Sequence, residues 1–246
     1  MKTLSEWKQQ YDQWADVDPN CASTGQRRDD AELDGLAAWL AERLQLAPGE
    51  SLLDVGCSTG ALTTRLARHA GPVTGVDFSE ALIEAARRHH AGTGVTFVPA
   101  EAADLPFADA TFDKGCCFGV LGTLPETGYA RRSIAELVRV VRPGGIVVVG
   151  SLPDDRRKHA FFDQLDAALP WWRRSVPRVL RWGVKKLLCP TSRPGQTQIR
   201  WFDVEVEAAL LRANGIDVTV IDDPQYAGYS RHRSTLVLRK PSEPWQ

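Results

Sequence analysis

The chain of 246 residues lacks several features that would assign it to a class at once. Its five cysteines are odd in number and include no Cys-x-x-Cys pair, so neither a disulfide framework nor a zinc site is expected. The formal net charge of −1 provides no global field for nucleic acid. No apolar run is long enough to cross a membrane, and the first residues show no secretory pattern. We therefore expect a cytoplasmic protein without a metal or a nucleic-acid partner.

The stretch 51–60, SLLDVGCSTG, is the most informative part of the sequence. A short apolar run ends in a turn with Gly56 and Gly60, and a helical pattern follows, which predicts a buried strand, a tight loop and a helix. Small residues in such a loop let a ligand lie against backbone N–H groups at the helix N-terminus. Asp54, at the end of the strand, suits a cationic or hydroxyl-bearing ligand better than a phosphate.

The segment DVGCSTG resembles the glycine-rich first motif of class I S-adenosylmethionine-dependent methyltransferases, acidic-x-Gly-x-Gly-x-Gly. Ser58 replaces the middle glycine, which is the one departure from that motif. A nicotinamide enzyme would share the strand–loop–helix plan, but its fingerprint Gly-x-Gly-x-x-Gly is absent. The resemblance implies S-adenosylmethionine as the cofactor.

Further segments resemble the same family in the expected order. The strand 73–77 ends in Asp77, where a carboxylate can accept hydrogen bonds from both ribose hydroxyls. The segment 99–107, PAEAADLPF, resembles the family's Gly-Asp-Ala-x-x-Leu-Pro-Phe, whose acid and following N–H bind the adenine edge, and Asp104 is an alternative to its first acid. The segment 143–145, Pro-Gly-Gly, is expected to break the preceding helix before an apolar strand over 146–151, and VRPGGIVVV resembles the Leu-Lys-Pro-Gly-Gly lead into the family's fifth strand. The segment YDQWA resembles one that helps to close the site, although an N-terminal helix packed on the core fits it equally.

The resemblance assigns one set of residues to the cofactor. Phe78 is expected against the adenine face, with ordinary core packing as the alternative, and the end of the strand 112–118 is expected to face the sulfonium methyl. The vicinal cysteines in that strand have no activating neighbour in sequence and fit buried packing better than redox chemistry. The full set is Tyr11, Asp54, Gly56, Cys57, Ser58, Gly60, Asp77, Phe78, Glu101, Ala102, Cys117 and Phe118.

The alternation of strands and helices predicts a single α/β domain over residues 1–246. The resemblance implies a Rossmann-like, seven-stranded, mostly parallel sheet with helices on both faces and a reversed final strand. An N-terminal helical flap is expected over 1–28 and a helical lid insertion over 153–200.

The insertion 153–200 carries eleven Lys and Arg against four Asp. It is interpreted as a lid that builds the acceptor pocket, as a membrane-surface contact through 171–188, or as solvated helices packed on the core. The lid is favoured because an insertion at this point lies over the carboxyl ends of the strands. Its aromatic residues, with the one that follows, are the expected substrate-binding residues: Trp171, Trp172, Trp182 and Trp201.

The implied reaction is in-line methyl transfer to O, N or S of a small-molecule acceptor. Alignment and water exclusion can carry much of the catalysis, so a dedicated base is not required. The candidate bases are His159, Tyr226, Tyr229 and His232, each of which also fits a structural or surface role. Two alternatives remain: a cofactor-using enzyme with other chemistry, such as cyclisation of the cofactor, and a membrane-surface or nucleic-acid-binding module that retains the fold.

Overall fold

The computed structural model describes residues 4–16, 20, 28–123, 127–159, 200–224 and 232–242. Most of the expected lid, with Trp171, Trp172 and Trp182, lies outside these residues, as do Tyr226 and Tyr229. The flap, the lid and the membrane-surface contact through 171–188 therefore stay predictions. Among the helices that the structure describes, none combines the length and apolar character needed to span a membrane.

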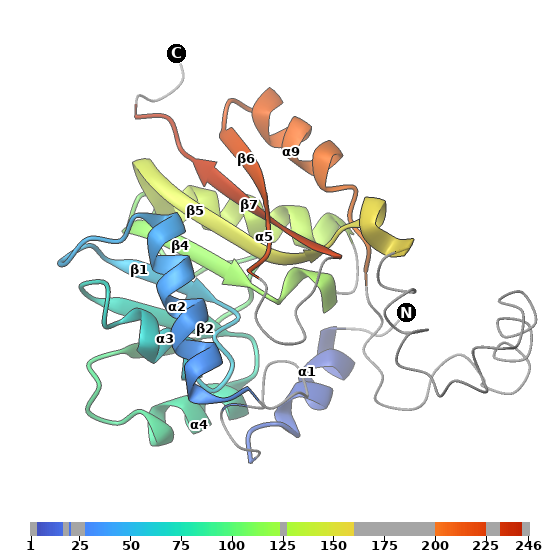
Figure 1. The fold of residues 1–246 in the computed structure, drawn as a ribbon. Coiled ribbons are helices and arrows are strands. Elements are labelled where there is room, and N and C mark those ends of the chain that lie inside the picture. Colours follow the sequence, from blue (N-terminus) through green and yellow to red (C-terminus); the bar gives the residue numbers. More distant parts are fainter. Residues whose placement is uncertain are drawn as a thin grey trace, which may run out of the picture.

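Strands and helices alternate along the described chain (Figure 1). The helices are α1 (Leu4–Asp12), α2 (Asp30–Leu44), α3 (Ala61–Leu66), α4 (Glu80–His89), α5 (Thr127–Val140) and α9 (Val204–Ala213), with short 3-10 turns η2 (Leu121–Thr123) and η3 (Asp155–Arg157). The strands are β1 (Leu52–Val55), β2 (Val73–Asp77), β3 (Thr96–Pro99), β4 (Phe112–Phe118), β5 (Val141–Pro153), β6 (Asp217–Asp222) and β7 (Arg233–Arg239).

The strands form one seven-stranded sheet in the order β3-β2-β1-β4-β5-β7-β6. β1 to β5 are parallel, and β7 pairs antiparallel with both β5 and β6. β6 consequently runs in the same direction as β5, so its carboxyl end lies at the same edge of the sheet as those of β1, β2 and β4. The predicted fold class, with its reversed last strand, is confirmed.

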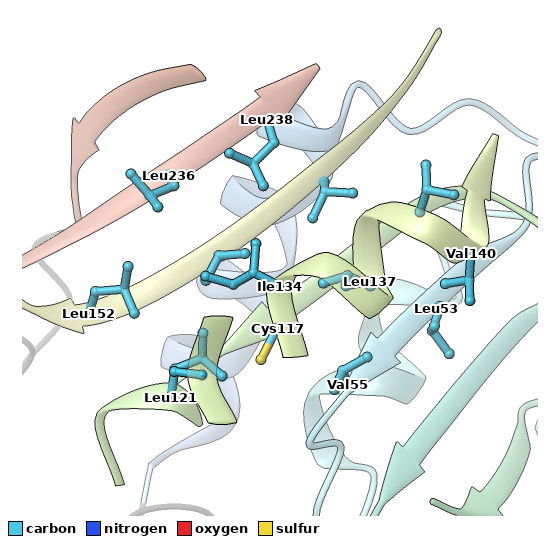
Figure 2. Packing of buried hydrophobic residues seen from close by; sticks show 14 of the residues in the cluster. Leu53, Val55, Cys117, Leu121, Ile134, Leu137, Val140, Leu152, Leu236 and Leu238 are labelled. Atoms are coloured by element: carbon cyan, nitrogen blue, oxygen red, sulfur yellow. The ribbon is translucent and has the colours of Figure 1, made fainter. Parts of the chain in front are cut away.

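Helices cover both faces of the sheet, as its apolar strands require. Leu36, Leu40 and Leu44 of α2 pack with β1, β4 and β5 on one face. On the other face, α5 and α9 pack against the same strands and β7. Figure 2 shows Leu137 and Ile134 of α5 among the buried side chains of this second layer.

Side-chain caps fix where two of the helices begin. Asp29 and Glu32 form a reciprocal capping box at the start of α2. The Ser79 hydroxyl accepts a hydrogen bond from the Leu82 N–H and starts α4. α4 therefore begins two residues after Asp77, which keeps that carboxylate at the edge of the sheet.

β5 is longer than the strand expected over 146–151. The Pro143–Gly145 segment, interpreted as a break before that strand, lies within β5, whose pairing with β4 shifts register between Phe112 and Lys114. A second irregularity separates Val149 from Leu152 in the pairing with β7. β5 thus carries a bulge on each side of its regular centre.

Candidate active site

The loop after β1 adopts a backbone conformation that small residues make possible. Gly56, Ser58 and Gly60 have positive φ angles of 80°, 52° and 83°. A Cβ on Gly56 would lie 2.2 Å from Cγ2 of Val120, and one on Gly60 would lie 2.6 Å from Cζ of Phe97. The two glycines are therefore required by close packing as well as by conformation. Ser58 takes the left-handed conformation that glycine would have in the family's motif.

Asp77 ties this loop to the end of the neighbouring strand. Its Oδ2 accepts a hydrogen bond from the Ser58 N–H at 3.0 Å, and its Oδ1 accepts one from the Ser79 N–H at 3.0 Å. Each oxygen keeps a second lone pair for a ligand. Burial raises the pKa of Asp77 to about 6, against the opposing effect of these N–H donors. The first-strand loop and the second-strand carboxylate thus form one unit.

Asp54 lies beneath the loop with 3% of its surface exposed. Its Oδ2 accepts a hydrogen bond from the Thr63 hydroxyl of α3 at 2.7 Å, and its Oδ1 lies 3.4 Å from Sγ of Cys116. Burial raises the pKa of this carboxyl above its usual range. Asp54 therefore joins β1, β4 and α3 while it presents a carboxylate to the pocket beside the loop.

A cavity of about 40 Å³ opens between this loop, the start of α2 and the end of β4. At this cavity, the buried Ser58 hydroxyl has no hydrogen-bond partner within the described part of the chain, which is the expected state of a group that a ligand satisfies. Asn20 and Arg28, which fall within the flap expected over 1–28, were not among the site residues that the sequence predicted. The lining residues are Asn20, Arg28, Leu33, Leu36, Asp54, Gly56, Cys57, Ser58, Thr59, Ala61, Leu62, Phe118 and Gly119.

Four of the residues expected at the cofactor are not among those that line this cavity: Tyr11, Phe78, Glu101 and Ala102. Tyr11 packs edge-on against Phe78, with ring centroids 5.5 Å apart, and the Ser79 hydroxyl donates to Asp12. α1 is therefore docked beside the end of β2. Glu101 is exposed in the turn after β3, and Ala102 is half-buried.

Cys117 lies on the far side of the sheet from the pocket. Its side chain packs with Leu53 and Leu121 in the cluster under α5 (Figure 2). Burial raises the pKa of its thiol far above the usual range, so it carries no thiolate. A contact between Cys117 and a ligand in the pocket would come from its backbone.

The two candidate bases that the structure describes differ in environment. His159 is exposed just beyond η3. His232 is buried, and desolvation with the nearby Arg233 lowers its pKa to about 4, which leaves a neutral and weakly basic ring. Trp201 lies beside it, with ring centroids 6.0 Å apart. Within the described ranges, no group of three His, Cys, Asp or Glu side chains could hold a metal ion.

Comparison with known proteins agrees with this geometry. Residues 53–149 match the family model described as a methyltransferase domain. A demethylmenaquinone methyltransferase of Clavibacter sepedonicus is 40% identical over 103 residues, which are 41% of this chain and 40% of that protein. O-methyltransferase cnsE of Penicillium expansum is 38% identical over 128 residues, 50% of this chain and 45% of that protein. The chain thus spans less than half the length of either relative.

Solved structures show the same fold over nearly the whole chain. A complex between the Haloferax volcanii Trm112 methyltransferase activator and a methyltransferase superposes with a TM-score of 0.64 at 16% identity, covering 94% of this chain and 97% of that chain. The sheet order and the loop after β1 are those of the class I S-adenosylmethionine-dependent methyltransferase fold.

Proposed function

We propose that this protein transfers the methyl group of S-adenosylmethionine to an O, N or S atom of a small metabolite. The observation that carries the proposal is the hydrogen bond between the Ser58 N–H and Asp77, which locks the loop after β1 to a carboxylate at the end of β2. The match of residues 53–149 to the methyltransferase domain supports it.

The residues around the pocket fit both ends of this cofactor. Asp77 has lone pairs for the ribose hydroxyls beside the loop. Asp54 and Arg28, of opposite charge, line one pocket and match the ammonium and carboxylate of an amino-acid group. The Ser58 hydroxyl supplies one more donor there.

The chemistry needs little from the protein beyond placement. The sulfonium of the bound cofactor supplies an electrophilic methyl group. Phe118 and Gly119, at the end of β4, line the same pocket as the loop, so they stand where an acceptor would be aligned and water excluded. His232, with its pKa of about 4, is a poor base at neutral pH, which supports catalysis by alignment.

The names of the relatives suggest the acceptor class. One name gives demethylmenaquinone as the acceptor, and the other gives an oxygen atom as the site of methylation. We infer that the acceptor is an aromatic small metabolite. Trp201, packed against His232 near the carboxyl edge of the sheet, supplies an aromatic surface there.

Calorimetry with S-adenosylhomocysteine tests the cofactor site. Asp77→Ala should weaken binding by about 1–3 kcal/mol through the lost ribose bonds. Asp217→Ala is the matched control, because Asp217 is an exposed carboxylate at the start of β6, at the edge of the sheet away from Asp77. Equal affinity of wild type and Asp77→Ala would refute the assignment of Asp77.

Product analysis by mass spectrometry tests the reaction. Incubation with S-adenosylmethionine and a mixture of quinols and phenols should give a product heavier by one methylene, together with S-adenosylhomocysteine. Without an acceptor the cofactor should persist. Breakdown of the cofactor without any acceptor would support the alternative of cofactor cyclisation instead.

A further inference from the structure

A second buried carboxylate, Asp223, lies at the same edge of the sheet directly after β6. Its surface is 7% exposed. Its Oδ1 accepts a hydrogen bond from the Thr235 hydroxyl at 2.6 Å and a longer one from the Ser151 N–H at 3.3 Å. Among the residues that the structure describes, its Oδ2 has no hydrogen-bond partner. A buried carboxylate oxygen left in this state destabilises the fold, so it calls for an explanation beyond packing.

The backbone beside Asp223 is irregular. Ser151 is a non-glycine residue with a φ of 61°, and it stands in the bulge that separates Val149 from Leu152 in the β5–β7 ladder. The Arg233 guanidinium donates to the Ser151 carbonyl at 2.8 Å and to its hydroxyl at 3.1 Å, which holds this conformation. Bulges and left-handed non-glycine residues gather next to functional sites, where they aim a group at a ligand.

Contacts connect this cluster with the cofactor pocket. The N–H of Gly119, which lines the pocket, donates a hydrogen bond to the Gly150 carbonyl of β5 at 3.1 Å. Ser151, in the bulge, is the next residue along β5. A Cβ placed on Gly150 would lie 2.3 Å from the Phe118 ring and 3.0 Å from the Thr235 hydroxyl. Phe118 and Thr235 therefore flank the same point on the α2 face of the sheet.

We propose that Asp223, held by Thr235 and the Ser151 bulge, forms an acceptor subsite that takes a hydrogen-bond donor of the methyl acceptor. The free Oδ2 binds a hydroxyl or ammonium group and so favours neutral or cationic acceptors over carboxylates. Phe118 gives the neighbouring wall an aromatic surface. The inference rests on the proposed methyl transfer and specifies the substrate class of that site.

The charges around Asp223 agree with a donor as its ligand. Burial raises the pKa of this carboxyl, while Arg233 and the bonds from Thr235 and Ser151 act in the opposite direction. When the carboxylate is ionised, its oxygen without a partner gains a charge-assisted hydrogen bond when a donor binds. A purely structural carboxylate would be expected to have both oxygens satisfied.

Two probes that differ in one hydrogen-bond donor test the subsite. Protein saturated with S-adenosylhomocysteine is titrated by ligand-detected NMR with phenol and with anisole, whose ether oxygen cannot donate. The wild type should bind phenol about tenfold more tightly than anisole, the value of one hydrogen bond to a charged group. Asp223→Asn keeps an acceptor for Thr235 and places an amide in the second position, so the ratio should fall to about one. Asp217→Asn, on the same strand, should keep the wild-type ratio.

Stability separates a ligand role from a structural one. Asp223→Asn should be no less stable than wild type in urea, because it removes an unpartnered carboxylate oxygen. If it fails to fold, Asp223→Glu decides: it keeps the charge but moves it by one methylene, and the ratio should fall at least threefold.

Several outcomes would overturn the subsite. These are equal binding or no binding of phenol and anisole by wild type, an unchanged ratio in Asp223→Asn, or a loss of folding in both the Asn and Glu variants. Failure to bind S-adenosylhomocysteine would instead refute the proposed function itself, so the two failures are distinguishable.

Discussion

Replacing Ser58 by glycine should stabilise the protein, although it shortens a side chain that is almost fully buried. Two costs meet at this residue. Its φ of 52° lies in the left-handed region, and its hydroxyl is buried without a partner. Glycine removes both costs, whereas alanine removes only the hydroxyl, so the two variants separate the contributions.

The magnitudes follow from the two features. A left-handed conformation costs a non-glycine residue about 1–2 kcal/mol, and glycine removes that cost. Glycine also loses more backbone entropy on folding, which offsets about 0.5–1 kcal/mol of the gain. An unsatisfied buried hydroxyl costs about 1–3 kcal/mol. Ser58→Ala should therefore raise the free energy of unfolding by about 1 kcal/mol, and Ser58→Gly by about 1.5–2 kcal/mol.

Urea unfolding followed by fluorescence measures these differences, with the slope of the transition as a check on two-state behaviour. Both variants should also bind S-adenosylhomocysteine about tenfold more weakly, because the hydroxyl is retained for the ligand. If both variants are less stable than wild type without cofactor, the reasoning about strain and desolvation at Ser58 is refuted.

Two further predictions concern the same loop. Gly56→Ala should lower the free energy of unfolding by about 3 kcal/mol in urea and abolish cofactor binding in calorimetry, because its Cβ would overlap Val120 at a φ of 80°. Gly92→Ala is the control: its φ is 82° but its Cβ would lie in open space, so the free energy of unfolding should fall by only about 1 kcal/mol. Equal losses of stability in the two variants would contradict the packing argument. For Asp77, the folded-state pKa of about 6 lies above the ordinary 3.8, so its contribution to stability is present below pH 3.8 and is lost as the pH rises through 6. Between pH 4 and pH 7 the wild type should lose about 2–2.5 kcal/mol relative to Asp77→Asn in urea unfolding, and parallel pH profiles would disprove the shift.

Periodicity and turn residues predicted most of the sheet, because its strands are short apolar runs bounded by Gly, Pro or Asp. β5 was the exception. The Pro143–Gly145 segment was interpreted as a break before the strand, but β5 begins at Val141 and includes it. The β4–β5 pairing shifts register between Phe112 and Lys114, a feature of strand pairing that local propensity does not contain.

The site was predictable where it follows a strand in sequence and hidden where it depends on pairing. Asp54 and Asp77 each end a parallel strand, and the sequence identified both. Asp223 stands in the same relation to β6, but that strand joins the edge only because β7 inserts between it and β5. The left-handed conformation of Ser58 was equally out of reach, since serine is not a residue that normally signals it.

The position of β7 has a consequence for the order in which the protein is made. β6 is hydrogen-bonded to β7 alone, and β7 is the last strand of the described chain (Figure 1). While a ribosome is still translating residues 233–239, β5 and β6 have no partner for their facing backbone groups. The nascent chain must then emerge with two open edges, so chaperone dependence and aggregation should be decided only once β7 has been made, after the glycine loop has already formed.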